Sequence, residues 1–591
     1  MIGCLGLVLA VPPVSQGSAR KRLLNKAENK PLHYQNAYRS VGYVGSRACA
    51  QCHPSVYQSF IKTDMGRSMS LPDDPAQLAI TSKPITIDVE KLDRTFQMFR
   101  QGSDIEQSEY ELGPDGKEVF RATHKIAYVI GAGALGFTYV VKRGNFLFEA
   151  PLSYYSQSKS WGPSPGYEDL DYGFSRPILP VCISCHSGLP QPVPHRPGLF
   201  EDPAFREMTI GCENCHGPGE MHVKALLAGN GTTGRIDPTI VNPADLSPWL
   251  ADNICMKCHQ GGDTRVLQPG MSYSDFRPGT PLNDTVAIFA VPFTAERTPE
   301  SPLLQHYELM ILSKCYRASG GKLHCLTCHD PHQQSPAAEA PAYYRKKCFI
   351  CHTDKSCSLP LAARLQGHPA DNCIGCHMPK EKLMVISHSA LSNHRIIAYK
   401  DEPFPEAAYH QTTAQVPDLI HLDAIPGSKT PLPPIVLLQA YGQLLDEHPE
   451  FRPRYLALLQ QLEQSEADNP LVLSAKAQQE SAAGTPQASE AARDDLGRAI
   501  TLGSTEPSDY QLYADALAQS GDLEGAIDVL KRGITQDPYY RRFYMDLTMR
   551  YVAAHEYDEA LRTMKDELNL FPEDPLMRKV LNTVQGGGSA P

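Results

Sequence analysis

The chain lacks a hydrophobic stretch long enough to cross a membrane as a confident helix, and it lacks an excess of basic residues. The nearest candidate for a membrane span, residues 2–14, is shorter than the roughly 20 apolar residues that a spanning helix needs. The formal net charge of -11 excludes the broad basic surface of a nucleic-acid-binding protein. No cysteine follows Cys376, so the C-terminal part lacks the chemistry described below.

The N-terminal apolar run also lacks the basic residues that usually precede it in a signal peptide. Residues 2–14 have the length of a signal-peptide core, and residues 17–19 (Gly-Ser-Ala) offer a cleavage site. We therefore expect residues 1–19 to be an export segment. Because the basic residues are missing, the assigned start codon is suspect. Cys4 is either a lipoprotein cysteine or a signal-peptide cysteine removed on maturation. Membrane association is expected only through such a lipid or an uncleaved signal.

What the chain does contain is one cysteine pattern, Cys-x-x-Cys-His, repeated seven times. This is the attachment pattern of c-type haem, in which two thiols bind the porphyrin and the adjacent imidazole reaches the iron. Zinc sites also use Cys-x-x-Cys pairs, but zinc does not require histidine directly after the second cysteine each time. We number the motifs one to seven in chain order. They are Cys49 to His53, Cys182 to His186, Cys212 to His216, Cys255 to His259, Cys325 to His329, Cys348 to His352 and Cys373 to His377.

Fourteen of the 17 cysteines belong to these motifs, so the sequence predicts seven covalently attached haem c groups. The second cysteines of the motifs are Cys52, Cys185, Cys215, Cys258, Cys328, Cys351 and Cys376, and the motif histidines are the expected proximal iron ligands. Besides Cys4, this leaves Cys315 and Cys357. These two could pair as a disulfide in an oxidising compartment or remain buried thiols.

A second axial ligand decides whether a haem only carries electrons or also binds substrate. His332 lies three positions after His329, which its own iron fixes, so His332 is expected to ligate a neighbouring haem. The expected distal ligands are His124, His222, His306, His332, His388 and His394. Reserve candidates are His33, His195, His324, His368, His410 and His421, with Met65 or Met69 as alternatives at the first haem, although core packing is the expected role of both methionines.

The spacing of the motifs indicates how the chain is organised. From His53 to His186 there are 133 positions, filled by short β-prone runs and turn residues, and we expect a small antiparallel β insert at about residues 85–155. Six motifs then follow on about 195 residues with Pro- and Gly-rich connections, which leaves little room for a polypeptide core. We expect residues 41–400 to be a seven-haem domain with the haems as its core.

A different periodicity follows a Pro-rich linker at residues 401–434. A period of 34 residues relates Gly521 to His555, Ala526 to Ala560 and Pro538 to Pro572. This is typical of tetratricopeptide repeats, the alternative being an undifferentiated helical bundle. We expect an α-solenoid over residues 435–585, through which redox partner proteins dock.

The motif surroundings resemble bacterial multihaem cytochromes c with tetratricopeptide tails. The resemblance is carried by Val44-Gly45-Ser46 ahead of the first motif, Gly211 to Gly219 around the third motif, Ser313-Lys314-Cys315, Cys325 to His332, and Cys376-His377-Met378-Pro379. Such proteins are similar to the superfamily of hydroxylamine oxidoreductase, cytochrome c nitrite reductase and their electron-accepting cytochromes. The resemblance implies His332 and His222 as distal ligands in a bis-histidine electron wire. The Cys-x-x-Cys-Lys site common in nitrite reductases is absent, and seven motifs are present where hydroxylamine oxidoreductases usually have eight.

Together these patterns predict a mainly α and irregular protein, with a haem-cored cytochrome domain, a small antiparallel β insert and a C-terminal α-solenoid. The expected function is that of an exported heptahaem cytochrome, periplasmic or at the cell surface, that transfers electrons between redox partners. One alternative is a multihaem oxidoreductase acting on a small nitrogen or sulfur compound at one open haem. A second alternative is a subunit of a haem-chain filament.

Overall fold

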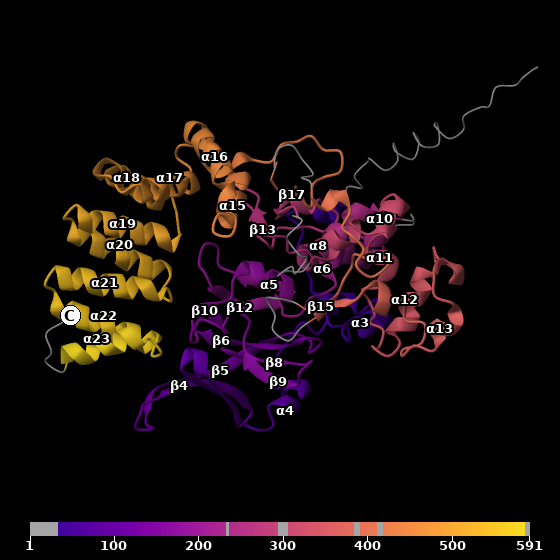
Figure 1. Ribbon diagram of the computed structural model, residues 1–591, viewed down its shortest axis with the longest axis horizontal. Helices are drawn as coiled ribbons and strands as arrows, with labels where there is room; N and C mark the ends of the chain where they lie inside the picture. Colours follow the sequence, from indigo (N-terminus) through magenta and orange to yellow (C-terminus); the bar gives the residue numbers. More distant parts are fainter. Residues whose placement is uncertain are drawn as a thin grey trace, which may run out of the picture.

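The computed structural model describes residues 34–231, 236–293, 305–382, 390–409, 416 and 418–585. The chain forms an antiparallel sheet, a region of short helices and loops that begins before the sheet and continues after it, and a C-terminal arc of helices (Figure 1). Within the described residues no helix is long and apolar enough to span a membrane. The expected export segment with Cys4, and the candidates His33, His388 and His410, lie outside the described residues.

The antiparallel sheet has ten strands, with the central order β10-β7-β6-β5-β4-β3-β2. Buried side chains alternate along its strands, for example Phe96 and Met98 on β3, because successive side chains of a strand point to opposite faces. The strands are β1 (Met69–Ser70), β2 (Ile85–Val89), β3 (Arg94–Gln101), β4 (Asp104–Leu112), β5 (Glu118–Ile130), β6 (Gly136–Arg143), β7 (Phe146–Glu149), β8 (Leu152–Tyr155), β9 (Ser160–Pro163) and β10 (Arg176–Pro177).

This sheet is larger than the small insert predicted at about residues 85–155. The additional strands β1 and β10 are only two residues long, and β9 contains Gly162 and Pro163. Such short or Gly- and Pro-containing strands have no alternating pattern that sequence periodicity can detect. The prediction of a small insert was therefore wrong in size, although its type is antiparallel.

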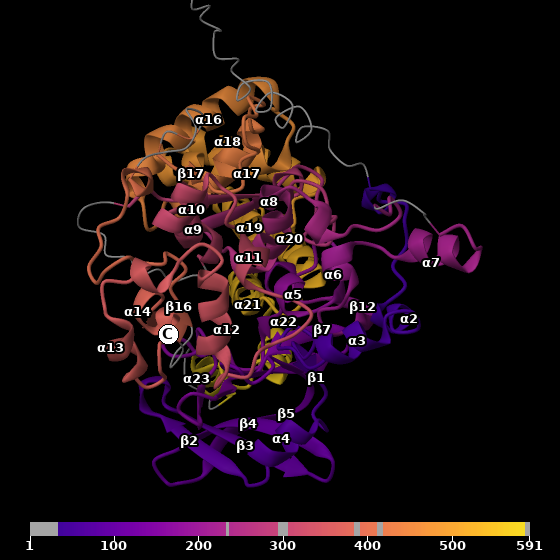
Figure 2. The same ribbon diagram turned by 90° about the vertical axis from the view of Figure 1, so that its right-hand side faces the viewer.

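The region of short helices carries the motifs; Figure 1 shows α6, α8, α11 and α12 on the side of the molecule opposite the yellow end of the helical arc, and Figure 2 views the molecule from that side. Its helices are α2 (Ser46–Cys49), α3 (Pro54–Phe60), α5 (Pro180–His186), α6 (Glu213–His216), α7 (Glu220–Leu227), α8 (Pro248–His259), α9 (His306–Ile311), α10 (Lys314–Ser319), α11 (Cys325–Cys328), α12 (Ala340–Cys348), α13 (Leu361–Leu365) and α14 (Cys373–His377). Helix α4 (Pro75–Ile80) precedes the sheet. Small strand pairings complete the region: β11 (Leu189–Pro192) with β12 (Phe200–Glu207), β13 (Thr264–Leu267) with β14 (Val286–Ala290) and β17 (Ile420–His421), and β15 (Lys380–Lys382) with β16 (Ala390–Ser392).

The part of this region that holds motifs five to seven has no buried apolar cluster among its described residues. Between Leu312 and Ala408, no apolar side chain among the described residues is buried. Polypeptide domains are normally held together by buried apolar side chains. We call this part the 313–407 lobe; its described residues supply no buried apolar side chain.

The C-terminal helices form antiparallel pairs that resemble tetratricopeptide repeats. Helices α19, α21 and α23 begin 34 residues apart, at Pro507, Arg541 and Pro575, which confirms the predicted period. Ala526 and Ala560 are fully buried where the paired helices meet. The helices are α15 (Pro434–Leu444), α16 (Arg452–Ser465), α17 (Pro470–Ala483), α18 (Pro486–Thr501), α19 (Pro507–Gln519), α20 (Leu523–Gln536), α21 (Arg541–Ala553), α22 (Tyr557–Leu570) and α23 (Pro575–Gln585).

This helical arm contacts the rest of the molecule at both ends (Figure 1). At its start, Ile435 of α15 packs in one cluster with Val266 and Phe289 of the small sheet. At its end, Arg94 of β3 donates a hydrogen bond to the carbonyl oxygen of Glu573 across 2.9 Å. The arm is therefore a bridge that is held at both ends.

Candidate haem-binding sites

Each motif forms one helical turn, which presents its cysteines and histidine together. In the first motif the amide of His53 donates to the carbonyl oxygen of Cys49 across 2.9 Å, and His216 and His329 repeat this bond to Cys212 and Cys325 at 3.0 Å. Residues three and four positions apart lie on one face of a helix. Local structure therefore places two thiols and an imidazole where one porphyrin could take all three.

The motifs lie next to one another in an order that differs from the chain order. A hydrogen bond joins the thiol of Cys49 to that of Cys212, and it raises the pKa of Cys49. Similar contacts join the second motif to the fourth, through Cys185 and Cys258, and the fourth to the fifth, through Cys255 and Cys325. Motif one thus lies beside motif three, and motif four beside motifs two and five.

The electrostatic neighbours of other motif thiols complete this arrangement. The thiol of Cys215 in motif three interacts with that of Cys255 in motif four. The same kind of interaction relates motif five to motif six and motif six to motif seven, through the pairs Cys328 with Cys351 and Cys348 with Cys373. The seven motifs therefore form one continuous group.

Three motif histidines face a second histidine, and each of these partners is one of the expected distal ligands. The ring centres of His216 and His332 are 5.9 Å apart, with an angle of 13° between the ring planes. Since a metal–imidazole bond is about 2 Å long, two imidazoles on opposite faces of one iron have ring centres about 6 Å apart. The other two pairs are His259 with His306 at 5.5 Å and His329 with His394 at 6.2 Å.

Hydrogen bonds to Nδ1 orient several of these rings. The Nδ1–H group of His216 donates to the carbonyl oxygen of Val241 across 2.8 Å, and that of His377 donates to Ile397 across 2.6 Å. Metal-binding histidines commonly donate one ring nitrogen in this way, which fixes the tautomer and the ring direction. In both motifs Nε2 is left as the atom that would bind iron.

His222 on α7 has a carboxylate partner. Its Nδ1–H group donates to Asp237 across 2.9 Å, and Asp237 also accepts bonds from the amide and hydroxyl of Thr239. Burial raises the pKa of Asp237, but the hydrogen bonds from Thr239 and His222 hold it below its ordinary value. His222 lies in the neighbourhood of His216.

Burial lowers the pKa of His216, the Val241 carbonyl raises it, and the nearby imidazoles of His332, His53 and His222 lower it further. The histidines of motifs one and three therefore lie in one region, together with two expected distal ligands.

His124 lies on β5 within the large sheet, with its ring centre 4.5 Å from that of Phe174. Burial, and then the charge of Arg143, lower the pKa of His124 to about 4. Among the described residues the structure brings no motif histidine into ring contact with it. Its role as a distal ligand stays a prediction, as does that of His388.

The reserve candidates have other surroundings. His421 of β17 bonds Asn283 across 3.0 Å, and the carbonyl oxygen of His195 accepts a bond from Gln536 of the helical arm. Met69 is 2% exposed in the apolar cluster beneath β1, which is the core role expected of it. Cys315 and Cys357 are free thiols.

Three motif histidines are accessible to solvent although protein surrounds them. His186, His259 and His329 are exposed, yet the protein atoms around each ring lower its pKa by desolvation. A flat apolar group bound beside these rings would cover their exposed surface.

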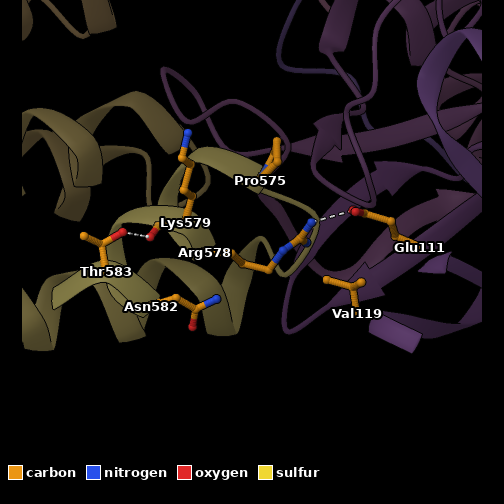
Figure 3. A pocket seen from close by; sticks show the side chains of 7 residues that line it. All are labelled: Glu111, Val119, Pro575, Arg578, Lys579, Asn582 and Thr583. Atoms are coloured by element: carbon orange, nitrogen blue, oxygen red, sulfur yellow. Dashed lines mark hydrogen bonds and ion pairs between the residues drawn. The ribbon is translucent and has the colours of Figure 1, made fainter. Parts of the chain in front are cut away.

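A surface pocket lies away from the motifs, between the large sheet and α23 (Figure 3). Arg578 points across it to Glu111, and the two form an ion pair of 2.6 Å. The lining also includes Val119, Pro575, Lys579, Asn582 and Thr583. None of these residues belongs to a motif. Over the described part of the chain, no three or more His, Cys, Asp or Glu side chains converge as a site for a bare metal ion.

No family model and no curated protein matches this sequence. Solved structures with a similar backbone include a crystal structure of MamA, with 18% identity and a TM-score of 0.22, covering 25% of this chain and 83% of that chain. The first TPR of Spaghetti (RPAP3) bound to an HSP90 peptide has 17% identity and a TM-score of 0.18, over 20% of this chain and 91% of that one. YrrB, described as a TPR protein with an unusual peptide-binding site, has 14% identity and a TM-score of 0.22, over 26% and 78%.

Proposed function

We propose that the protein is an exported heptahaem c-type cytochrome that transfers electrons between redox partners. The observation that carries the proposal is the arrangement of the motifs, since all seven adjoin at least one other. Haem bound there would supply one-electron chemistry at iron, with a potential set by axial ligands, burial and hydrogen bonds. The chain's own residues would attach each group through two thiols and offer its iron the motif imidazole, with a second imidazole close by at motifs three, four and five.

Two further observations support bound haem. The 313–407 lobe holds three motifs and has no buried apolar side chain among its described residues, so porphyrin faces would supply the missing core. His216, His259 and His329 each face a second imidazole at a separation that fits one shared iron. Such six-coordination favours a carrier over an enzyme at these three positions.

The resemblance to multihaem cytochromes c and their superfamily is part of this proposal and rests on the motifs. Haem is joined to such motifs outside the cytoplasm, which supports a periplasmic or cell-surface location. The helical arm would hold the cytochrome in a complex with its redox partner, since solenoids offer extended binding surfaces. Met549 and Val552 of α21 are 59% and 40% exposed and are available for such a contact.

The decisive experiment is a haem count by pyridine haemochrome together with a ferric spectrum of the purified protein. Seven haems, all low-spin, are expected. A protein without covalent haem would overturn the proposal. A high-spin haem whose spectrum shifts with nitrite or hydroxylamine would replace it with the enzyme alternative.

The docking role of the arm is tested separately with a Met549→Asp variant. A complex with the redox partner should be lost on native gels while the haem count stays at the wild-type value. Retention of the complex would remove this face of α21 as the docking surface.

A further inference from the structure

Two of the three histidine pairs are in contact with each other. The ring centres of His306 and His394 lie 4.3 Å apart, with 69° between the ring planes. His259, His306, His394 and His329 therefore form one unbroken sequence of rings, here called the four-histidine row.

The distances divide the row into two outer pairs and one central contact. The outer separations, 5.5 Å from His259 to His306 and 6.2 Å from His394 to His329, fit imidazoles on opposite faces of one iron. The central 4.3 Å is too short for a shared iron, which needs about 6 Å between ring centres. It is the separation of two rings in direct contact.

Backbone contacts around His306 hold its ring between those of His259 and His394. His306 is the first residue of α9, and its Nδ1–H group donates to the carbonyl oxygen of His259 across 3.2 Å. A β-bridge between Gln260 and Gln305 fixes the two segments side by side. Nε2 of His306 is left as the ligand atom.

The other end of the row is held independently. The Nδ1–H group of His394 donates to the carbonyl oxygen of Ser392 across 2.9 Å, at the end of the β15–β16 hairpin that follows motif seven. Nδ1 of His329 is hydrogen-bonded to the hydroxyl of Tyr344 across 3.2 Å. In both rings Nδ1 is engaged, which leaves Nε2 as the atom that would bind iron.

We propose that His306 is the distal ligand of the motif-four haem, that His394 is the distal ligand of the motif-five haem, and that their contact makes each ring position the other. This inference rests on the proposed function, because it requires haem at both motifs. It goes beyond that function by pairing the ligands and by linking two sites through one side-chain contact. Loss of His306 then disturbs two haems, the one that it ligates and the one whose ligand it supports.

The test is a His306→Ala variant of the holoprotein, studied by ferric electron paramagnetic resonance. One low-spin haem should become high-spin, and the g values of a second low-spin haem should shift. Added imidazole should return the first haem to low spin. The matched control is His332→Ala, which removes a ligand whose ring, among the described contacts, packs against His216 alone. One haem should change in that control, without a shift in a second.

A His306→Met variant covers the case in which the alanine variant does not fold. Methionine can still ligate iron and raises the haem potential relative to histidine, so one midpoint potential should rise while all haems stay low-spin. The inference is overturned if His306→Ala leaves every haem low-spin, or if it changes one haem and leaves all other signals unaltered. In the methionine variant, unchanged potentials overturn it. A wild-type haem count of zero would overturn the proposed function instead, and the haemochrome assay reports that separately.

Discussion

The imidazole of His222 donates its Nδ1–H group to the carboxylate of Asp237 across 2.9 Å. This is the arrangement that orients metal-binding histidines and increases their basicity, and the loss of such a partner typically changes metal affinity by about 10–100-fold. A more basic ligand stabilises ferric over ferrous iron. If His222 ligates a haem, Asp237 therefore lowers the potential of that haem.

An Asp237→Asn variant should raise the midpoint potential of one of the haems. A tenfold loss of preference for the ferric state corresponds to about 59 mV for one electron. Spectroelectrochemical titration of the holoprotein measures this shift. Asp245→Asn is the control, because Asp245 bonds Asn242 and leaves the His222 pair intact. Unchanged midpoint potentials in Asp237→Asn would contradict the prediction that Asp237 tunes a haem through His222.

The 313–407 lobe should depend on haem for its folding. It contains motifs five to seven, and no apolar side chain is buried among its described residues, whereas the helical arm buries many. Expression without the haem-attachment machinery should therefore give a protein that proteases cut within this lobe while the arm stays intact. Limited proteolysis followed by mass spectrometry compares the two forms. Equal resistance of the lobe with and without haem would contradict this prediction.

Features encoded in a few neighbouring residues could be predicted from the sequence. The 34-residue period of the arm was of this kind, because tetratricopeptide units repeat the same small residues at helix contacts such as Ala526 and Ala560. Each of the seven motifs could also be recognised, because it consists of five consecutive residues. The two-residue strands β1 and β10 were missed because so short a strand carries no period.

The neighbours of each motif could not be predicted, because they depend on long-range packing. Motif two lies beside motif four and motif one beside motif three, through contacts of cysteines far apart in the chain. The sequence nominated His306, His332 and His394 as distal ligands but gave no means of pairing them. The ring of His332 packs against that of His216, a residue more than 100 positions earlier, although His332 lies only three positions after His329.

Removal of Phe543 should destabilise the helical arm. Its side chain is 1% exposed and packs against the rings of Tyr510 and Tyr540. Truncation of a buried phenylalanine to alanine costs about 3–5 kcal/mol of the free energy of unfolding. Urea unfolding followed by circular dichroism should show this loss for Phe543→Ala. Met549→Ala, at a position 59% exposed, is the control and should change stability by less than about 0.5 kcal/mol.

Arg94 joins the end of the arm to the large sheet through buried charges. Its side chain is 7% exposed and forms ion pairs with Glu109, Glu111 and Asp171 at 3.0–3.3 Å. Removal of one partner of a buried ion pair leaves an uncompensated charge and costs about 3–5 kcal/mol. Arg94→Ala should therefore lower the urea midpoint of the full chain. Lys91→Ala is the control, because Lys91 and its partner Asp169 are largely exposed.

The same junction should weaken as the pH rises. The surroundings of Glu573 raise its pKa to about 7: burial raises it most, its own backbone amide lowers it, the charge of Asp171 raises it, and the charges of Arg541 and Arg143 lower it. A carboxyl group with a pKa raised above the unfolded value of about 4.5 favours folding while it is protonated. Its contribution is complete below pH 4.5 and is lost as the pH rises through 7.

The urea midpoint of the arm should consequently be lower at pH 8 than at pH 6, and Glu573→Gln should reduce that difference, because a neutral amide does not ionise. Glu559→Gln is the matched control, since Glu559 lies on the surface of α22, paired with Arg562. It should leave the pH dependence as in the wild type. A pH dependence that Glu573→Gln does not alter would assign the effect to other buried carboxyl groups of the arm, such as Glu567, whose pKa burial raises to about 9.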